Sequence, residues 1–161
     1  MKKLIIVRHG KSSWDLPVND IDRTLNQKGI QDSNLVANNL IPYLPTFFVI
    51  WSSIAKRASE TALIFAQCFI YPTKDIQFKK ELYTFDDNQL ENVIKSCDNG
   101  LETIILFGHN EAITNFVNKF GDVYIDNVPT AGMVFLQFDT DDWKKINEGK
   151  TIKTLFPKNL K

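Results

Sequence analysis

Two continuously apolar runs constrain the fold of this chain more than any other feature of its sequence. Leu4 to Val7 and Thr103 to Phe107 consist almost entirely of branched aliphatic and aromatic residues. Runs of this kind are typical of strands buried on both faces, as in a parallel sheet. Each run leads directly into a polar triplet, Arg8-His9-Gly10 in the first case and Gly108-His109-Asn110 in the second. The sequence therefore predicts a parallel sheet that carries both histidines of the chain at strand ends.

Strands and helices alternate along the rest of the chain. We predict helices where apolar residues recur at helical spacing, and strands where short apolar runs occur. The expected elements are helices over about 27–44, 58–69, 90–97 and 113–120, with strands at 47–51, 76–78 and 133–138 and one or two more within 143–156. Ser52 or Ser53 is expected to cap the second helix. This order predicts one domain over residues 1–161, a three-layer α/β/α fold with a mostly parallel central sheet.

Composition and charge exclude several classes of protein. The net charge is zero and the pI is about 6.7, so we expect no general affinity for nucleic acid or an anionic membrane. The apolar run after Met1-Lys2-Lys3 is too short for a signal peptide, and no run approaches the ~20 residues of a membrane span. Cys68 and Cys97 have no metal or redox spacing and are expected to be reduced, buried thiols. These features predict a cytoplasmic protein.

Four ionic side chains are expected to meet at one edge of the sheet. Arg8 and His9 follow the first strand, Arg57 lies in the first turns of the helix after the second strand, and His109 follows the fourth. In α/β sheets of this kind, ligands bind outside the carboxyl ends of the strands. Arginine matches phosphate oxygens bidentately, and a histidine can act as a covalent nucleophile in phosphoryl transfer. The cluster therefore predicts phosphoryl transfer, with a neutral nucleophile and a second histidine, protonated by the bound dianion, that donates to a phosphoryl oxygen.

Other kinds of site are disfavoured. Gly10-Lys11-Ser12 resembles the end of a phosphate-binding P-loop, but Ile5 stands where that motif needs its first glycine. The arginines beside both histidines would repel a metal cation, so we expect no metal ion. The sequence carries no indication of oligomeric state.

The motifs as a set resemble the histidine phosphatase superfamily, which has a phosphoglycerate mutase-like fold. The matching stretches are Arg8-His9-Gly10, Ser53-x-x-x-Arg57-Ala58-x-Glu60-Thr61 and Gly108-His109-Asn110. Leu25-Asn26-x-x-Gly29 and the small size are most similar to SixA-type phosphohistidine phosphatases. The resemblance implies that His9 is the phosphorylated nucleophile, held through its other ring nitrogen by a neighbouring carbonyl, with Gly10 allowing the close approach. It also implies that Arg8, Arg57 and His109 bind the phosphate, and that the enzyme needs no cofactor.

The chain departs from the family pattern at two positions. Asp15 stands where many relatives carry an asparagine near the phosphate, and its carboxylate would repel a dianion, so we leave it outside the site. Thr84 stands where ester-cleaving relatives place a glutamate that acts as general acid. An imidazole leaving from phosphorus needs little acid assistance, whereas an alkoxide needs protonation. The second departure therefore favours a phosphohistidine substrate, carried by a signalling or phosphotransfer protein.

Two alternatives stay open at this stage. The chain could be a phosphatase of small phosphate esters that uses Glu81 or Asp86 as its acid, or a non-catalytic module that binds phosphate. An intact His9 speaks against the module, because binding needs only the arginines. Of two tryptophans expected to be exposed, Trp14 and Trp143, we expect Trp14 to lie near the cleft, since it is five residues past His9.

Overall fold

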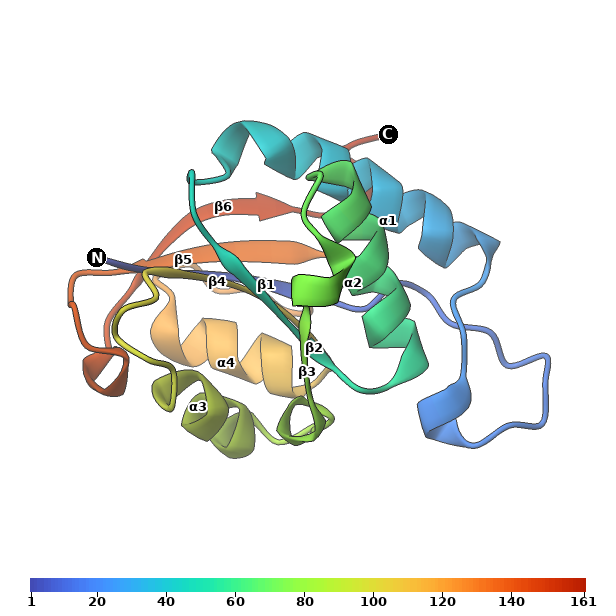
Figure 1. Cartoon of the computed structure of the whole chain (residues 1–161), viewed down its shortest axis with the longest axis horizontal. Helices are drawn as coiled ribbons and strands as arrows, with labels where there is room; N and C mark the ends of the chain where they lie inside the picture. Colours follow the sequence, from blue (N-terminus) through green and yellow to red (C-terminus); the bar gives the residue numbers. More distant parts are fainter.

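The computed structural model describes all residues, 1–161, as a six-stranded sheet covered by helices on both faces (Figure 1). The strand order is β3-β2-β4-β1-β5-β6. Its three pairs on the β3 side are parallel, whereas β5 runs antiparallel to both β1 and β6, so that only β5 opposes the rest. The strands are β1 Lys2–Arg8, β2 Val49–Ser53, β3 Gln77–Lys79, β4 Thr103–Gly108, β5 Met133–Phe138 and β6 Lys150–Leu155. The predicted mostly parallel α/β fold is confirmed.

The helices form one layer on each side of the sheet, as Figure 1 shows for α1 and α2 above and α3 and α4 below. They are α1 Gln27–Leu40, α2 Lys56–Cys68, α3 Asp87–Lys95 and α4 Ala112–Phe120. Alternate side chains of β1 enter different cores. Ile5 and Val7 pack in the core that contains α1 and α2, whereas Leu4 and Ile6 pack in the core that contains α3 and α4. This double burial explains why the strand is continuously apolar.

Two predicted boundaries were wrong because an apolar residue does not by itself extend an element. The second strand begins at Val49 rather than Phe47, whose side chain is 86% exposed. The first helix ends at Leu40 and continues only as a 3-10 turn over Ile41–Tyr43, since Pro42 lacks the amide hydrogen that an α-helix needs.

The predicted serine cap and two burial predictions also need correction. Ser52 and Ser53 belong to β2, and Ala55 is the N-cap of α2, without a side-chain hydrogen bond. Trp143 is fully buried, and its indole N–H donates to the Leu101 carbonyl at 2.7 Å. Cys97 is buried, but Cys68 is only half-buried; both are free thiols.

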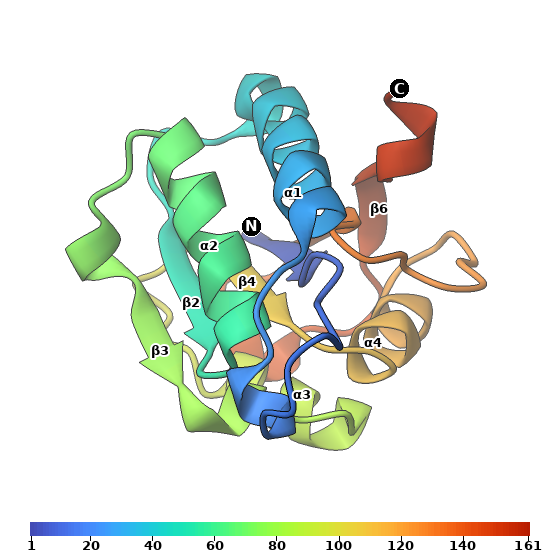
Figure 2. The same cartoon turned by 90° about the vertical axis from the view of Figure 1, so that its right-hand side faces the viewer.

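The carboxyl ends of β1, β2 and β4 lie at one edge of the sheet, because the three strands are parallel and adjacent. A long polar segment, residues 9–26, follows β1 there and contains one 3-10 turn at Asp20–Asp22. Figure 2 looks onto this segment, coloured blue, in front of the sheet and beneath α1 and α2. No helix of the chain is long and apolar enough to cross a membrane.

Candidate active site

His9 directly follows β1, and two neighbours fix the state of its ring. The Gly10 carbonyl oxygen lies 2.7 Å from Nδ1, and the Arg57 Nε–H points at Nε2 from 3.3 Å. Because a carbonyl only accepts and a guanidinium only donates, the proton is on Nδ1 and Nε2 keeps its lone pair. Burial, reinforced by the charges of Arg57 and Arg8, lowers the pKa of His9 to about 4. His9 is therefore neutral at pH 7 and has the lone pair that a nucleophile requires.

Two arginines lie beside His9 and line the same pocket. Arg57 is the second residue of α2, and its side chain is only 2% exposed. Arg8 is the last residue of β1; its Nη1 donates to the Val128 carbonyl at 2.9 Å, and its Nε is buried without a partner. Two guanidinium groups next to a histidine are chemically suited to bind a phosphoryl group.

His109 follows β4 and is fixed by Ser53, the last residue of β2. His109 Nε2 lies 2.8 Å from Ser53 Oγ, which also accepts from the Ala55 amide at 3.2 Å. The buried Ser53 hydroxyl hydrogen has no other acceptor, so we assign it to Nε2 and place the histidine proton on Nδ1. Nδ1 is buried without a partner, so its proton is not engaged within the chain.

His109 is neutral at pH 7. Burial, with the neighbouring His9 and Arg57 adding, lowers its pKa to about 2. The imidazolium predicted to form once the dianion is bound stays a prediction. In the structure the neutral ring carries an Nδ1–H that can donate without prior protonation.

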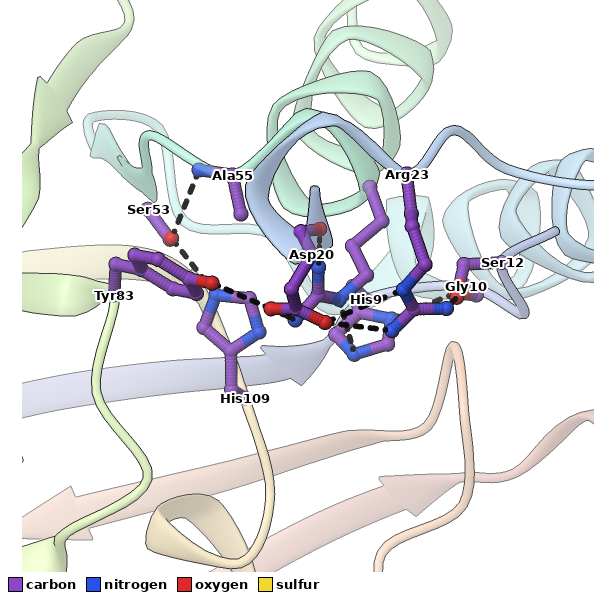
Figure 3. Close-up of polar contacts among 10 residues, drawn as sticks. His9, Gly10, Ser12, Asp20, Arg23, Ser53, Ala55, Tyr83 and His109 are labelled. Carbon is purple, nitrogen blue, oxygen red and sulfur yellow. Dashed lines mark hydrogen bonds and ion pairs between the residues drawn. The ribbon is translucent and has the colours of Figure 1, made fainter. Parts of the chain in front are cut away.

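An aromatic wall covers His109. The rings of Tyr83 and Phe85 lie 5.2 and 5.5 Å from its ring, centroid to centroid, and the His9 ring lies at 5.2 Å. Figure 3 shows Tyr83 and His9 near His109. Phe85 lines the pocket, whereas His109, 1% exposed, lies behind the lining. His109 is thus shielded from solvent, which strengthens electrostatic interactions around its ring.

The segment after β1 forms a closed loop over the pocket. The Ser13 amide donates to the Thr24 carbonyl at 2.8 Å, and Glu60 of α2 accepts from the Leu25 amide at 2.8 Å. These bonds hold the base of the loop against α2. Trp14 lies within the loop and lines the pocket, so the prediction that it lies near the cleft is confirmed.

Arg23, at the end of the loop, adds a guanidinium group that the sequence analysis missed. It lines the pocket, donates to Ser12 Oγ, and lies 3.6 Å from the centre of the Trp14 ring. A cation over a tryptophan face is attracted by the ring, so Trp14 and Arg23 hold each other at the rim.

One carboxylate, Asp20, lies among these cations. It accepts from Arg57 Nη2 at 3.0 Å, from Arg23 Nε and Nη2 at 3.2 Å each, and from the Tyr83 hydroxyl (Figure 3). The Tyr83 hydrogen bond, followed by the contacts with Arg57, lowers the pKa of Asp20 to about 2. Asp20 is therefore an anion at any working pH.

The pocket has a volume of about 350 Å³ and is strongly cationic, since Lys11 joins the three arginines in its lining. Such a lining suits a phosphate dianion. A larger pocket of about 580 Å³ lies at the opposite edge of the sheet, near Phe47 and Leu101, but it contains no arginine or histidine. We therefore place the candidate site by its chemistry rather than by cavity size.

Several residues singled out in the sequence lie outside the pocket lining. Gly10 packs against both α1 and α2 instead: its amide donates to Thr61 Oγ1 of α2 at 2.9 Å, and a Cβ there would meet Ser33 Oγ of α1 at 2.8 Å. Its contact with the site is the carbonyl that holds His9. Asp15 is exposed and also outside the lining, as expected.

The candidate general acids also lie outside the pocket lining. Glu81 and Asp86 do not line it, and the Asp86 carboxylate caps α3 by accepting from the Asn88 amide at 3.0 Å. Thr84 does not line it either; its hydroxyl donates to Gln89 and accepts from the Asp86 amide. No group of three or more histidine, cysteine or carboxylate side chains is arranged to hold a metal ion.

Comparison with known proteins identifies the family. The family model of the histidine phosphatase superfamily (branch 1) matches residues 4–85, about half of the chain. The chain belongs to this superfamily. An uncharacterized chloroplastic protein of Arabidopsis thaliana is 30% identical over 155 residues, which cover 89% of this chain and 70% of that protein.

Solved structures of histidine phosphatases share the fold. The protein histidine phosphatase SixA, complexed with tungstate, matches with a TM-score of 0.83 and 22% identity over 99% of both chains. A protein from Agrobacterium tumefaciens described as a putative phosphohistidine phosphatase SixA matches with a TM-score of 0.76 and 23% identity. The match covers 96% of this chain and 97% of that one. The phosphoglycerate mutase-like, SixA-like architecture is thereby confirmed.

The residues that sequence reasoning missed in this histidine phosphatase come from loops and strand ends. Arg23 stands two residues before the Leu25-Asn26-x-x-Gly29 motif, and this position was the only available signal for it. Ser53 was assigned to a helix cap instead of His109. Asp20 and Tyr83 come from separate loops and are joined only by the tertiary fold, so no local pattern links them.

Proposed function

We propose that this protein is a metal-independent phosphatase that acts through phospho-His9, with phosphohistidine of a signalling or phosphotransfer protein as its substrate. His9 Nε2 attacks phosphorus in line and forms a P–N bond, while the bond to the leaving group breaks. Arg8, Arg57 and the Nδ1–H of His109 stabilise the charge on the equatorial oxygens. Water then attacks phospho-His9, which releases inorganic phosphate and restores the neutral ring.

The observation that carries this proposal is the state of His9. Its Nδ1–H is bound to the Gly10 carbonyl, so Nε2 is unprotonated, and the residue lines the pocket together with two neighbouring arginines. Binding of phosphate alone would need the guanidinium groups but not a fixed histidine tautomer. A covalent step explains both features.

The surroundings of the leaving group favour phosphohistidine over an ester. An alkoxide leaving group needs a proton, and the loss of a general acid costs about 10²–10⁴-fold in rate. Thr84, Glu81 and Asp86 do not line the pocket, and Asp20 is held as an anion. An imidazole leaves phosphorus with little acid assistance, so a phosphoramidate suits this site better.

The test is phosphate release from a histidine-phosphorylated protein, measured for the wild type and for His9→Ala. We expect release by the wild type, none by His9→Ala, and a labelled phospho-His9 after a rapid alkaline quench. Asp15→Asn is the matched control, because Asp15 lies in the same loop but outside the pocket. Activity on small esters but not on phosphohistidine would overturn the substrate assignment, and saturable phosphate binding without labelling of His9 would indicate the binding module.

A further inference from the structure

Both terminal nitrogens of Arg57 are engaged by one residue of its own chain. Nη1 donates to the Asp20 carbonyl oxygen at 2.7 Å, and Nη2 donates to the Asp20 carboxylate at 3.0 Å. The Nε–H points at His9. A phosphoryl group that bound Arg57 bidentately through Nη1 and Nη2 would therefore compete with Asp20 for these nitrogens.

Arg23 is engaged by the same carboxylate. Both its Nε and its Nη2 donate to one Asp20 oxygen, while the Tyr83 hydroxyl and Arg57 donate to the other. Two arginines that line the pocket, together with Tyr83, therefore point hydrogen-bond donors at a single internal anion, much as the arginines would at the oxygens of a bound phosphoryl group. No other carboxylate lines the pocket.

We propose that Asp20 is a specificity-determining residue, an internal anion that any incoming phosphoryl group must displace from Arg57 and Arg23. Free phosphate and other small oxyanions can displace the Asp20 carboxylate only through their own interactions with the arginines. A phosphoryl group on a protein also brings contacts from its carrier, which can offset the cost of displacing the carboxylate. The pocket thus discriminates against free oxyanions, including its own product. This inference rests on the proposed function.

The local structure allows Asp20 to leave. It lies in a three-residue 3-10 turn with no buried residue, and 45% of its side chain is exposed. The backbone of the loop is anchored at its base, at Ser13 and Leu25, and at this turn through the Asp20 carbonyl, which accepts from Arg57; neither anchor uses the Asp20 carboxylate. The carboxylate can therefore rotate into solvent while the base of the loop, and with it the rest of the pocket, stays in place.

The experiment is calorimetric titration of inorganic phosphate and of orthovanadate into the wild type, Asp20→Ala and Asp22→Ala. We expect Asp20→Ala to bind both anions at least about tenfold more tightly, since charge-assisted hydrogen bonds no longer compete for the arginines. Asp22→Ala removes the same charge from the same turn, and the Asp22 carboxylate contacts neither arginine. It should change the affinity by less than about twofold, since exposed charges are screened by salt.

A second variant weakens the contacts of the Asp20 carboxylate without removing its charge. Tyr83→Phe removes one donor to the Asp20 carboxylate and leaves all arginines, so it should also tighten phosphate binding, though less than Asp20→Ala. In turnover assays, Asp20→Ala should be inhibited by phosphate at a concentration at least about tenfold lower than the wild type.

The outcomes separate this inference from the proposed function. If the wild type and Asp20→Ala bind phosphate equally, or if Asp20→Ala binds it more weakly, Asp20 does not compete and the inference is wrong while the phosphatase proposal stands. If Asp22→Ala tightens binding as much as Asp20→Ala, only overall charge matters and the inference is again wrong. If no variant binds either oxyanion, the proposed function itself fails.

Discussion

A single hydroxyl group, that of Ser53, sets the proton position on His109. We predict that Ser53→Ala lowers kcat for the phosphatase reaction by about 10- to 100-fold, the effect of losing a hydrogen bond worth about 1.5–3 kcal/mol in the transition state. Without Ser53, the neutral ring can move its proton to Nε2, and Nδ1 then no longer donates to a phosphoryl oxygen. The measurement is kcat and KM across pH.

The neighbouring serine offers a matched control. Ser52 is equally buried in β2, but its hydroxyl donates to the Ser53 carbonyl at 2.9 Å rather than to a histidine. Ser52→Ala should leave kcat within about twofold, and Ser53→Thr, which keeps a hydroxyl, should restore most of the activity. An equal loss in both alanine variants would mean that Ser53 acts only through the stability of the strand.

Residues at strand ends could be located from the sequence, but residues that contact them across loops could not. Arg8, His9 and His109 follow uninterrupted apolar runs, and a run of that kind ends where the sheet ends. The structure brings these three together with Arg57, as expected from parallel strands. Asp20 and Tyr83 are 63 residues apart and meet only because both loops cover the same edge, which depends on the complete fold.

Among the elements, the start of α1 has the tightest packing against the site. Gly29 lies in the first turn, and a Cβ there would lie 2.1 Å from the Lys11 carbonyl oxygen and 2.9 Å from the Lys11 amide nitrogen. That carbonyl also accepts from the Asn26 amide at 2.9 Å, so the helix start and the residues just after His9 are joined directly. The glycine is needed for this close approach of two backbones.

We predict that Gly29→Ala destabilises the fold by about 1–3 kcal/mol, as overpacking does, and also lowers phosphatase activity because the segment after His9 must shift. Gly100→Ala is the control, since its Cβ would meet only the Asp98 side chain, at 3.2 Å. Denaturant unfolding and kcat, measured together, test both effects. A stable Gly29→Ala variant with full activity would show that this contact does not position the site.

The elements themselves follow from periodicity, whereas their ends follow from tertiary contacts. Every predicted helix and strand exists. The helices and the inner strands bury coherent apolar faces, whereas β3 and β6 are the edge strands of the sheet and are only partly buried. Phe47 was misassigned because its hydrophobicity does not reveal that it lies outside the sheet, at the edge of a surface pocket. The helix cap was misassigned because Ser53 is equally suited to cap a helix or to hold a histidine.

For the whole molecule, burial of both histidines makes folding sensitive to acid. The pKa values of His9 and His109, usually 6.5, are lowered to about 4 and about 2 in the folded protein. Below pH 6.5 the unfolded chain therefore binds more protons than the folded chain. Stability is therefore complete above pH 6.5 and falls as the pH drops, by at most about 1.4 kcal/mol per pH unit for each histidine. His9 contributes to this fall down to about pH 4, and His109 to lower pH.

Denaturant unfolding between pH 7 and 5 tests this prediction, because the chain has only two histidines and its lowered carboxylates titrate below that range. We expect His9→Gln to show about half the wild-type slope of unfolding free energy against pH. A wild-type slope near zero in this interval would contradict the burial of the two rings.

The pairing of β1 with β4 also determines when the site can exist. Arg8 lies opposite Gly108 in this pair, so the two histidines that follow are separated by about one strand spacing, although they stand 100 positions apart in the chain. During synthesis on the ribosome, His9 emerges early, but its partner strand is completed only after two-thirds of the chain has been made. The nascent protein must therefore keep an apolar strand unpaired for most of its translation. The two histidines can come together only after β4 has been made.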